Sequence, residues 1–292
     1  MSIWVLRGLR DGVVTTKWPR KPDEYAENWR GPVMVAPASA NPDISGIDCP
    51  TGAITATDER VRVDQGKCIL CGRCVTARPD LFAWSRGSTG PRAAALNRQA
   101  LVVPDEPETD EALETARIAL ARRTAALRQS VHVRHVDAGS DGSEEWEIQA
   151  LAGPVYDLHR LGVFFTASPR HADILLVTGA GTEGMAGPLT TTYDGMPDPK
   201  VVIAVGTDAC SGGLLGASPG SAPPDGVLLD GVLPNSAGPG RRLTGPGAVI
   251  PVDVWIPGSP PSPFAILNAL LMAVGKLAGD RAGARNGTEA GA

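Results

Sequence analysis

One hydrophobic pattern recurs through the second half of the chain. Short apolar runs rich in β-branched residues lie at 131–137, 172–180, 200–208 and 249–258. Runs of this length predict buried strands, and the sequence between them is compatible with helices. Strands that alternate with helices form a parallel sheet with helices on its faces. We therefore expect the α/β fold class for this part of the molecule.

The loops that follow these strands are the expected ligand-facing edge of the sheet. Ligands of open parallel sheets bind at the carboxyl ends of the strands. Three polar, glycine-containing loops fall there, at 138–145, 206–213 and 256–263. We expect this larger domain to span 131–279, with a Gly/Pro-rich flexible insertion at 216–247 and a disordered tail at 280–292.

The chain before residue 131 divides into three segments of different character. Residues 1–31 mix basic and aromatic side chains without periodicity, and we expect them to form an arm that lies on a partner. Residues 32–85 are short elements around cysteines, which predicts a small ferredoxin-like iron–sulfur domain. Residues 86–130 form a linker, in which charges surround apolar residues at 107–129 as in a helix that bridges two domains.

Charge and hydropathy exclude several classes of function. The formal net charge is −5 and no block of Lys and Arg occurs, so we expect no nucleic-acid partner. The N-terminal apolar run is broken by charges too early for a signal peptide, which favours the cytoplasm. The most apolar segment, 262–279, is too short and is interrupted by Asn268, so we expect no direct membrane span.

The cysteines carry the strongest motif. Of five in the chain, Cys68, Cys71 and Cys74 have C-x2-C-x2-C spacing, and Cys49 is followed by proline. Three thiolates at this spacing plus a remote cysteine before proline resemble one half of a bacterial two-cluster ferredoxin. We expect these four cysteines to bind one [4Fe–4S] cluster. A zinc site with four thiolate ligands is the alternative.

The other half of the ferredoxin pattern is absent. Its cysteines would fall at Ser39, Pro42, Ser45 and Arg78. The losses therefore remove every ligand of one cluster and leave every ligand of the other, which favours a single functional cluster over random decay.

No catalytic constellation is present, and we expect no catalytic residue in this chain. The stretch GAGTEG at 179–184 has the spacing of a dinucleotide fingerprint. Gly187 and Pro188 are expected to interrupt the helix that should follow it. We therefore interpret these glycines as a strand-ending turn rather than an NAD site.

The larger domain resembles a known family over about half of the chain. The resemblance lies in the stretches VRHVDAGSDGSEEWEIQALAGPVYDLHRLGVFFTASPRHADILLVTG, MPDPKVVIAVGTDACSGG and PVDVWIPGSPPSPFAILNALL. They are similar to the small electron-transfer subunit, of the complex I 20 kDa type, that respiratory complex I shares with membrane-bound energy-converting [NiFe] hydrogenases. The resemblance implies a flavodoxin-like parallel sheet, a terminal [4Fe–4S] cluster and a large partner subunit of the hydrogenase or complex I 49 kDa type.

The chain departs from that family at the terminal cluster. The family's cysteines would fall at Asp141, Glu144, Asp208 and Ser259, all of which bear oxygen here. Oxygen ligands suit hard cations better than iron–sulfur chemistry, so we expect no terminal cluster. We expect the acids to pair with basic residues of the large subunit or with Arg170 and His171; a bound cation is the alternative. Cys210 is expected to be a small buried residue.

These observations predict an iron–sulfur electron-transfer subunit of a membrane-associated complex related to NADH:quinone oxidoreductase and to hydrogenases of the formate hydrogenlyase kind. Membrane-embedded subunits of the complex would hold it peripherally on the inner face of the cell membrane. The alternative is a non-catalytic structural subunit whose cluster only stabilises the small domain. A redox sensor is a third possibility.

Overall fold

The computed structural model describes residues 3–21, 30–36, 44, 46–56, 60–86, 94–103, 115, 118–120, 122–127, 130–216 and 243–276. The expected bridging helix at 107–129 and the insertion at 216–247 lie largely outside these residues. The tail at 280–292 lies entirely outside them.

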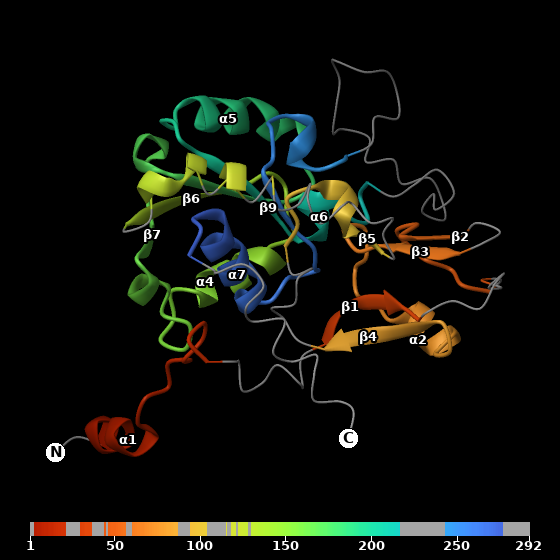
Figure 1. Ribbon diagram of the computed structural model, residues 1–292, viewed down its shortest axis with the longest axis horizontal. Helices are drawn as coiled ribbons and strands as arrows, with labels where there is room; N and C mark the ends of the chain where they lie inside the picture. The colour runs from red at the N-terminus through yellow and green to blue at the C-terminus, as the bar shows by residue number, and fades with distance from the viewer. Residues whose placement is uncertain are drawn as a thin grey trace.

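The larger part of the molecule is built on a five-stranded parallel sheet (Figure 1). Its strands are β6 (Val131–Asp137), β7 (Val163–Phe165), β8 (Ile174–Thr178), β9 (Val201–Val205) and β10 (Val254–Ile256). They are ordered β7-β6-β8-β9-β10, and every neighbouring pair is parallel. This is the flavodoxin-like order, whose ligand crevice lies where the winding reverses, between β6 and β8. The predicted α/β fold class is confirmed.

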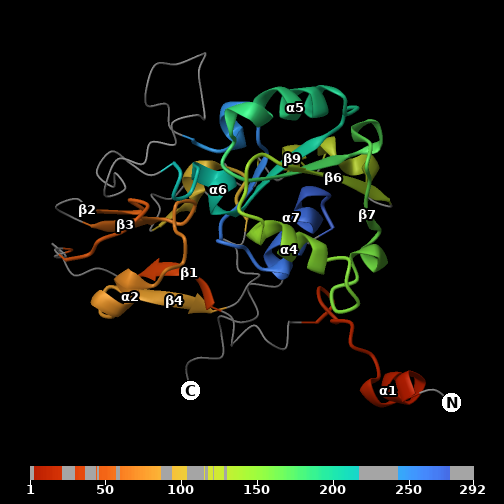
Figure 2. The same ribbon diagram turned by 180° about the vertical axis from the view of Figure 1, so that it is seen from behind.

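Helices cover both faces of this sheet (Figures 1 and 2). One face carries α4 (Ser143–Ala150) and α7 (Pro263–Ala273), and the other carries α5 (Glu183–Asp194). Alternate residues of β8 divide between two hydrophobic clusters, Ile174 and Leu176 toward α7, Leu175 and Val177 toward Leu189 of α5. Each such side chain contributes about 1.5–3 kcal/mol when fully buried. Short turns of helix complete this part: η3 (Ala125–Leu127), η4 (Leu158–Leu161), η5 (Pro169–His171), α6 (Gly206–Ser211) and η6 (Pro246–Ala248).

Helix α5 corrects one expectation from the sequence. Pro188 lies inside this helix and does not interrupt it. The proline removes one backbone hydrogen bond, but the next residue, Leu189, is completely buried against the sheet. Burial of that face outweighs the lost bond and carries the helix through the proline.

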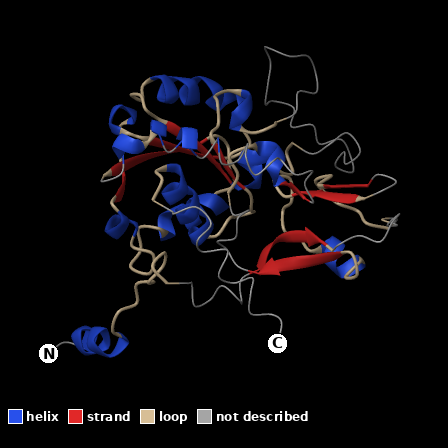
Figure 3. Ribbon diagram, viewed as in Figure 1, coloured by secondary structure: helices blue, strands red, loops and turns tan. Residues whose placement is uncertain are grey.

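The smaller part contains two antiparallel sheets and one short helix (Figure 3). Strand β1 (Arg30–Val35) pairs with β4 (Phe82–Arg86), and β3 (Val61–Asp64) pairs with both β2 (Ile54–Ala56) and β5 (Val102–Val103). Helix α2 (Arg73–Ala77) and the turn η2 (Arg98–Leu101) complete it. Val33, Val63 and Phe82 are buried in its core, which also includes the side chain of Cys74. The likeness to a ferredoxin and the domain boundaries stay predictions.

The first described segment begins with a helix that stands apart from the three sheets. Helix α1 spans Ile3–Asp11, and none of its residues is buried. Within the part of the chain that the structure describes, no helix combines the length and the apolar character that a membrane span needs.

Candidate functional site

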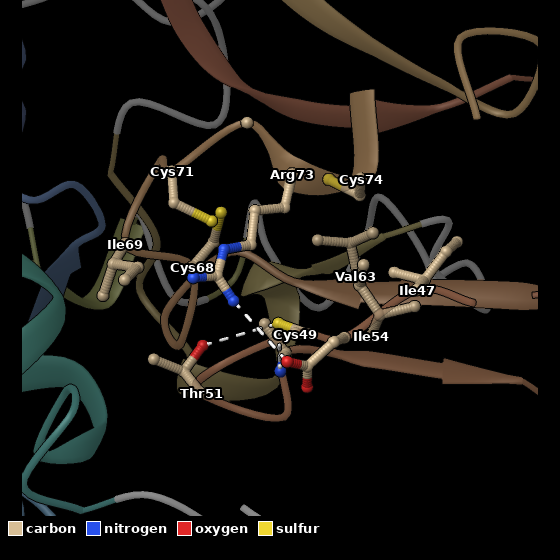
Figure 4. Close-up of a pocket in the computed structure, with 13 residues that line it drawn as sticks. Ile47, Cys49, Thr51, Ile54, Val63, Cys68, Ile69, Cys71, Arg73 and Cys74 are labelled. Carbon is tan, nitrogen blue, oxygen red and sulfur yellow. Dashed lines mark hydrogen bonds and ion pairs between the residues drawn. The ribbon is translucent and has the colours of Figure 1, made fainter. Parts of the chain in front are cut away.

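The four cysteines singled out from the sequence line one pocket in the smaller part (Figure 4). Cys49 precedes β2, Cys68 and Cys71 lie in the loop after β3, and Cys74 lies on α2. The pocket contains about 370 Å³ of empty space, part of it open to solvent. Its walls are otherwise mainly aliphatic, from Ile47, Ala53, Ile54, Val63 and Ile69. The fold therefore brings together thiols that are up to 25 positions apart in the sequence.

The loop around Cys71 has an unusual backbone. Leu70 and Gly72, on either side of it, have φ angles of 56° and 75°, in the left-handed region. Leucine adopts this region at a cost of about 1–2 kcal/mol. A Cβ atom at Gly72 would lie 2.9 Å from the indole ring of Trp84, so only glycine fits there. The chain accepts this strain in order to wrap the cysteine loop around the pocket.

Backbone N–H groups point at the sulfur atoms. The Ala53 N–H donates to Cys49 Sγ at 3.3 Å, and Cys49 Sγ lies 3.7 Å from Thr51 Oγ1. Backbone N–H groups of Leu70 and Val75 similarly oppose the rise in pKa at Cys68 and Cys74. Donors of this kind stabilise thiolate and adjust the potential of iron–sulfur centres.

Burial and crowding act in the opposite direction. Burial raises the pKa of Cys68 to about 12, and the nearby thiols of Cys74, Cys49 and Cys71 raise it further. Burial also raises the pKa of Cys74. Burial thus favours the neutral thiols of Cys68 and Cys74, and a nearby positive charge such as that of a metal centre would favour their thiolates.

Two kinds of metal centre are bound by four cysteine thiolates, and they require different arrangements of the sulfur atoms. Among the residues that the structure describes, no three His, Cys, Asp or Glu side chains converge as ligands of one metal ion. In a [4Fe–4S] cubane each cysteine ligates a different iron, so the sulfur atoms stand around a central volume instead of meeting at a point. A zinc ion would require all four sulfur atoms at about 2.3 Å from one point.

The oxygen-bearing residues at the family's terminal-cluster positions also come together. Asp141 precedes α4, Glu144 lies in its first turn, and Asp208 lies on α6 at the end of β9. Ser259 follows Gly258, whose carbonyl accepts the Thr207 N–H at 2.6 Å, next to Asp208. All four residues thus lie around the carboxyl edge of the sheet, where the sequence placed them.

The acids of this group differ in protonation. Burial, together with the charges of Asp208 and Asp141, raises the pKa of Glu144 to about 7. Burial and the charge of Asp141 raise the pKa of Asp208 to about 6. Asp141 accepts a hydrogen bond from the Ser143 N–H at 2.9 Å, and contacts with Ser143 lower its pKa. The raised pKa values of Glu144 and Asp208 therefore reflect the cost of burying charge in this acidic group.

The sequence analysis did not anticipate a polar network beside these acids. Glu145 accepts hydrogen bonds from the hydroxyls of Thr178 and Ser140, the latter at 2.9 Å. His135 Nε2 lies 3.0 Å from Thr178 Oγ1 and 3.5 Å from Glu145 Oε1. The sequence signal that could have identified this network is the alternation of side chains along β6. It places His135 on the same face as Val131 and Val133, which is the face that α4 covers.

The expected pairing of the acids with Arg170 and His171 is wrong. These two residues lie in η5, which precedes β8 and hence sits at the amino end of the sheet. The acids occupy the carboxyl end, and both Arg170 and His171 are exposed. Opposite ends of a parallel strand cannot share an ion pair.

Cys210 is a buried residue of the larger part, as expected. Its side chain is 3% exposed, and its Sγ approaches the carbonyl of Ile256 at 3.6 Å. Burial raises the pKa of Cys210 to about 12, which leaves it as a neutral thiol.

Two contacts join the cysteine pocket to the acidic edge of the sheet. Thr207 Oγ1 donates to the carbonyl of Cys68 at 3.0 Å. Arg98 forms two hydrogen bonds with the carboxylate of Asp64, at 2.8 and 3.0 Å, and a third with the carbonyl of Cys210 at 2.8 Å. The candidate cluster site therefore lies against the helix that carries Asp208.

Comparison with known proteins places this arrangement in a family. Residues 142–273 match the family described as NADH ubiquinone oxidoreductase, 20 Kd subunit. The probable membrane-bound hydrogenase subunit mbhJ of Pyrococcus furiosus is 38% identical over 159 residues, which cover 54% of this chain and 83% of that protein. Because this relative is 38% identical and the match covers 83% of its length, it shows the family of this chain. The chain belongs to the 20 kDa subunit family.

Other relatives span both branches of this family. Formate hydrogenlyase subunit 7 of Escherichia coli is 34% identical over 180 residues, 62% of this chain and 61% of that protein. One NADH-quinone oxidoreductase subunit of Citrifermentans bemidjiense is 36% identical over 135 residues, 46% and 66% of the two proteins. A chain from the membrane-bound sulfane sulfur reductase, an archaeal respiratory membrane complex, is 28% identical with a TM-score of 0.38, covering 52% of this chain and 74% of that one.

Proposed function

We propose that this chain is an iron–sulfur electron-transfer subunit of a membrane-associated complex related to hydrogenases and NADH:quinone oxidoreductase. The observation that carries the proposal is the pocket lined by Cys49, Cys68, Cys71 and Cys74. A [4Fe–4S] cluster held there would supply a one-electron carrier. The large subunit and the membrane-embedded subunits would be its partners, and association through them would hold the chain on the inner face of the membrane.

The protein's own residues would bind and insulate this carrier. The four cysteines supply thiolate ligands, Ala53 donates an N–H to one of them, and aliphatic side chains line the rest of the pocket. Arg73 lies at the pocket and pairs at 3.5 Å with Asp48 on its exposed side (Figure 4). The contact between Thr207 and Cys68 would set the pocket at a fixed place on the larger part.

A structural subunit is the second candidate. The carboxyl groups of Asp141, Glu144 and Asp208 stand where the family resemblance implies cluster ligands, so the usual next electron carrier has no thiolates to hold it. In that case the cysteine site would only stabilise the smaller part.

A paired substitution in the assembled complex distinguishes the two. Cys71→Ser removes a proposed ligand, while Cys210→Ser removes a buried thiol outside the pocket and is the control. Electron transfer predicts that Cys71→Ser abolishes electron flux per assembled complex while Cys210→Ser preserves it. The structural candidate predicts less assembled complex with Cys71→Ser, but unchanged flux in the complex that remains.

A further inference from the structure

The N-terminal helix α1 carries an apolar surface that nothing covers in the described part of the chain. Ile3, Trp4, Leu6 and Leu9 are 80%, 75%, 54% and 74% exposed. The apolar surface continues into Val13 and Val14 just beyond the helix, both also exposed. Single exposed apolar residues are ordinary, but a contiguous group of this size marks a surface that meets another apolar phase.

Three apolar residues of α1 lie on the side away from its arginines. At about 100° per residue, Val5, Leu6 and Leu9 fall on one side and Trp4 just beyond its edge, while Ile3 falls on the opposite side. Arg7 and Arg10 fall on the other side. A short helix with a wide apolar face, a basic opposite face and tryptophan at the boundary is typical of helices that lie in a membrane surface.

Charge favours a lipid surface over an apolar protein groove. Residues 3–21 contain five basic side chains and one acidic one, while the whole chain has a net charge of −5. The five basic residues, Arg7, Arg10, Lys17, Arg20 and Lys21, are all exposed. Anionic lipid headgroups attract a concentration of positive charge of this kind next to an apolar helix.

The helix is attached to the larger part at a defined place. The Thr16 N–H donates to the carbonyl of Val155 at 2.8 Å, and Thr15 Oγ1 donates to the carbonyl of Pro154 at 2.7 Å. Trp18 is buried and packs edge-on against Phe264, with ring centroids 5.9 Å apart. Beyond this attachment α1 stands clear of the three sheets in both views (Figures 1 and 2).

We propose that α1 is a surface anchor that inserts its apolar face into a bilayer containing anionic lipids. This inference goes beyond the proposed electron-transfer role, because the chain would touch the membrane directly and not only through partner subunits. The expectation that the arm lies on a partner protein becomes the competing outcome.

Flotation of the purified full chain with vesicles tests the proposal. The vesicles contain either phosphatidylcholine alone or phosphatidylcholine with phosphatidylglycerol. We expect binding to the anionic vesicles that weakens as salt is added. Because each arginine near an anionic surface contributes about fivefold, Arg7→Gln with Arg10→Gln should weaken binding on the order of 30-fold. Leu6→Asp with Leu9→Asp should abolish it, and Arg122→Gln, an exposed arginine outside the arm, should leave it unchanged.

The thermal melting of every arm variant should match the parent, because α1 buries no residue. Absence of binding to anionic vesicles would overturn the proposal. Binding of the arginine and leucine variants as strong as that of the parent protein would overturn it as well. If the isolated large subunit protects α1 from proteolysis in the absence of lipid, the arm binds that protein instead of a membrane. Vesicle binding requires no iron, so its failure and a failure of the electron-transfer proposal are separate results.

Discussion

Thr207 and Cys68 connect the two parts of this molecule. The hydroxyl of Thr207, which is completely buried, donates to the carbonyl of Cys68 at 3.0 Å. Cys68 is a proposed cluster ligand, and Thr207 immediately precedes Asp208 at the family's terminal-cluster position. The candidate cluster therefore lies beside the place where this family's terminal cluster is expected, although that place holds carboxyl groups in this chain.

Thr207→Val should weaken this junction. The substitution keeps the side-chain shape but leaves the Cys68 carbonyl without its partner, at a cost of about 1–2 kcal/mol in the free energy of unfolding. Urea unfolding measures the loss. Thr207→Ser, which retains the hydroxyl, should recover most of it; an unaltered stability in Thr207→Val would mean that the hydrogen bond contributes nothing.

Arg98→Lys should destabilise the same junction. Arg98 holds both carboxylate oxygens of Asp64 and the carbonyl of Cys210, and a lysine cannot reproduce this fork. We expect a loss of about 2 kcal/mol in urea unfolding. Asp80→Asn is the control, because Asp80 pairs with Arg78 at 2.7 Å at the protein surface, where an ion pair should contribute much less than the Arg98 contacts. Equal losses in the two variants would contradict this role for Arg98.

Glu144 should make stability depend on pH. Its folded-state pKa of about 7 lies above the ordinary value of 4.5, so the contribution of Glu144 to stability is fully present below about pH 4.5 and is lost as the pH rises through about 7. Burial dominates this shift. Between pH 5 and pH 8 the parent protein should lose about 2 kcal/mol in the free energy of unfolding because of Glu144. Urea unfolding should show that Glu144→Gln removes this loss.

Asp141→Asn provides the matched comparison for Glu144. The pKa of Asp141 is lowered by its contacts with Ser143, so its contribution is present above the ordinary pKa and is lost only as the pH falls. The variant should leave most of the difference in stability between pH 5 and pH 8 in place, because burial, and not the charge of Asp141, is the main cause of the raised pKa of Glu144. If the free energy of unfolding of Glu144→Gln changed with pH as much as that of the parent protein, Glu144 would be ionised over the whole range from pH 5 to pH 8.

Gly179→Ala should disrupt the turn between β8 and α5. Its φ is 84°, and an added Cβ would lie 2.5 Å from backbone atoms of Gly139 and Ser140. We expect a loss of about 3 kcal/mol in thermal or urea unfolding. Gly184→Ala, in helix α5 with open space around the new Cβ, should instead stabilise by about 0.5–1 kcal/mol. Similar effects at the two glycines would contradict this role for the turn.

Much of the larger part could be predicted from the sequence, because its strands are short apolar runs that can be recognised without knowing the rest of the fold. The runs at 172–180 and 200–208 became β8 and β9, and the loops that follow the strands brought Asp141, Glu144 and Asp208 together. The grouping of the four cysteines could also be predicted, because it follows from their spacing in the sequence. The position of their pocket against α6 could not be predicted, because it depends on the fold of both parts.

The failures share one physical cause, which is that tertiary contacts override local signals. Pro188 has the local character of a helix breaker, yet burial of Leu189 retains the helix. Arg170 and His171 were expected near the acids because of the family resemblance, but a full strand, β8, separates them from the carboxyl edge. The Glu145 network depends on which side of α4 faces the sheet, and adjacent Glu144 and Glu145 give no local clue.

The most direct measurement is the iron and acid-labile sulfide content of the purified chain, taken with an EPR spectrum after reduction. One cubane at Cys49, Cys68, Cys71 and Cys74 predicts about four irons and about four sulfides per chain. The iron should be lost in Cys71→Ser and retained in Cys210→Ser. Zinc in place of iron, or about eight irons from a second cluster in the larger part, would contradict it.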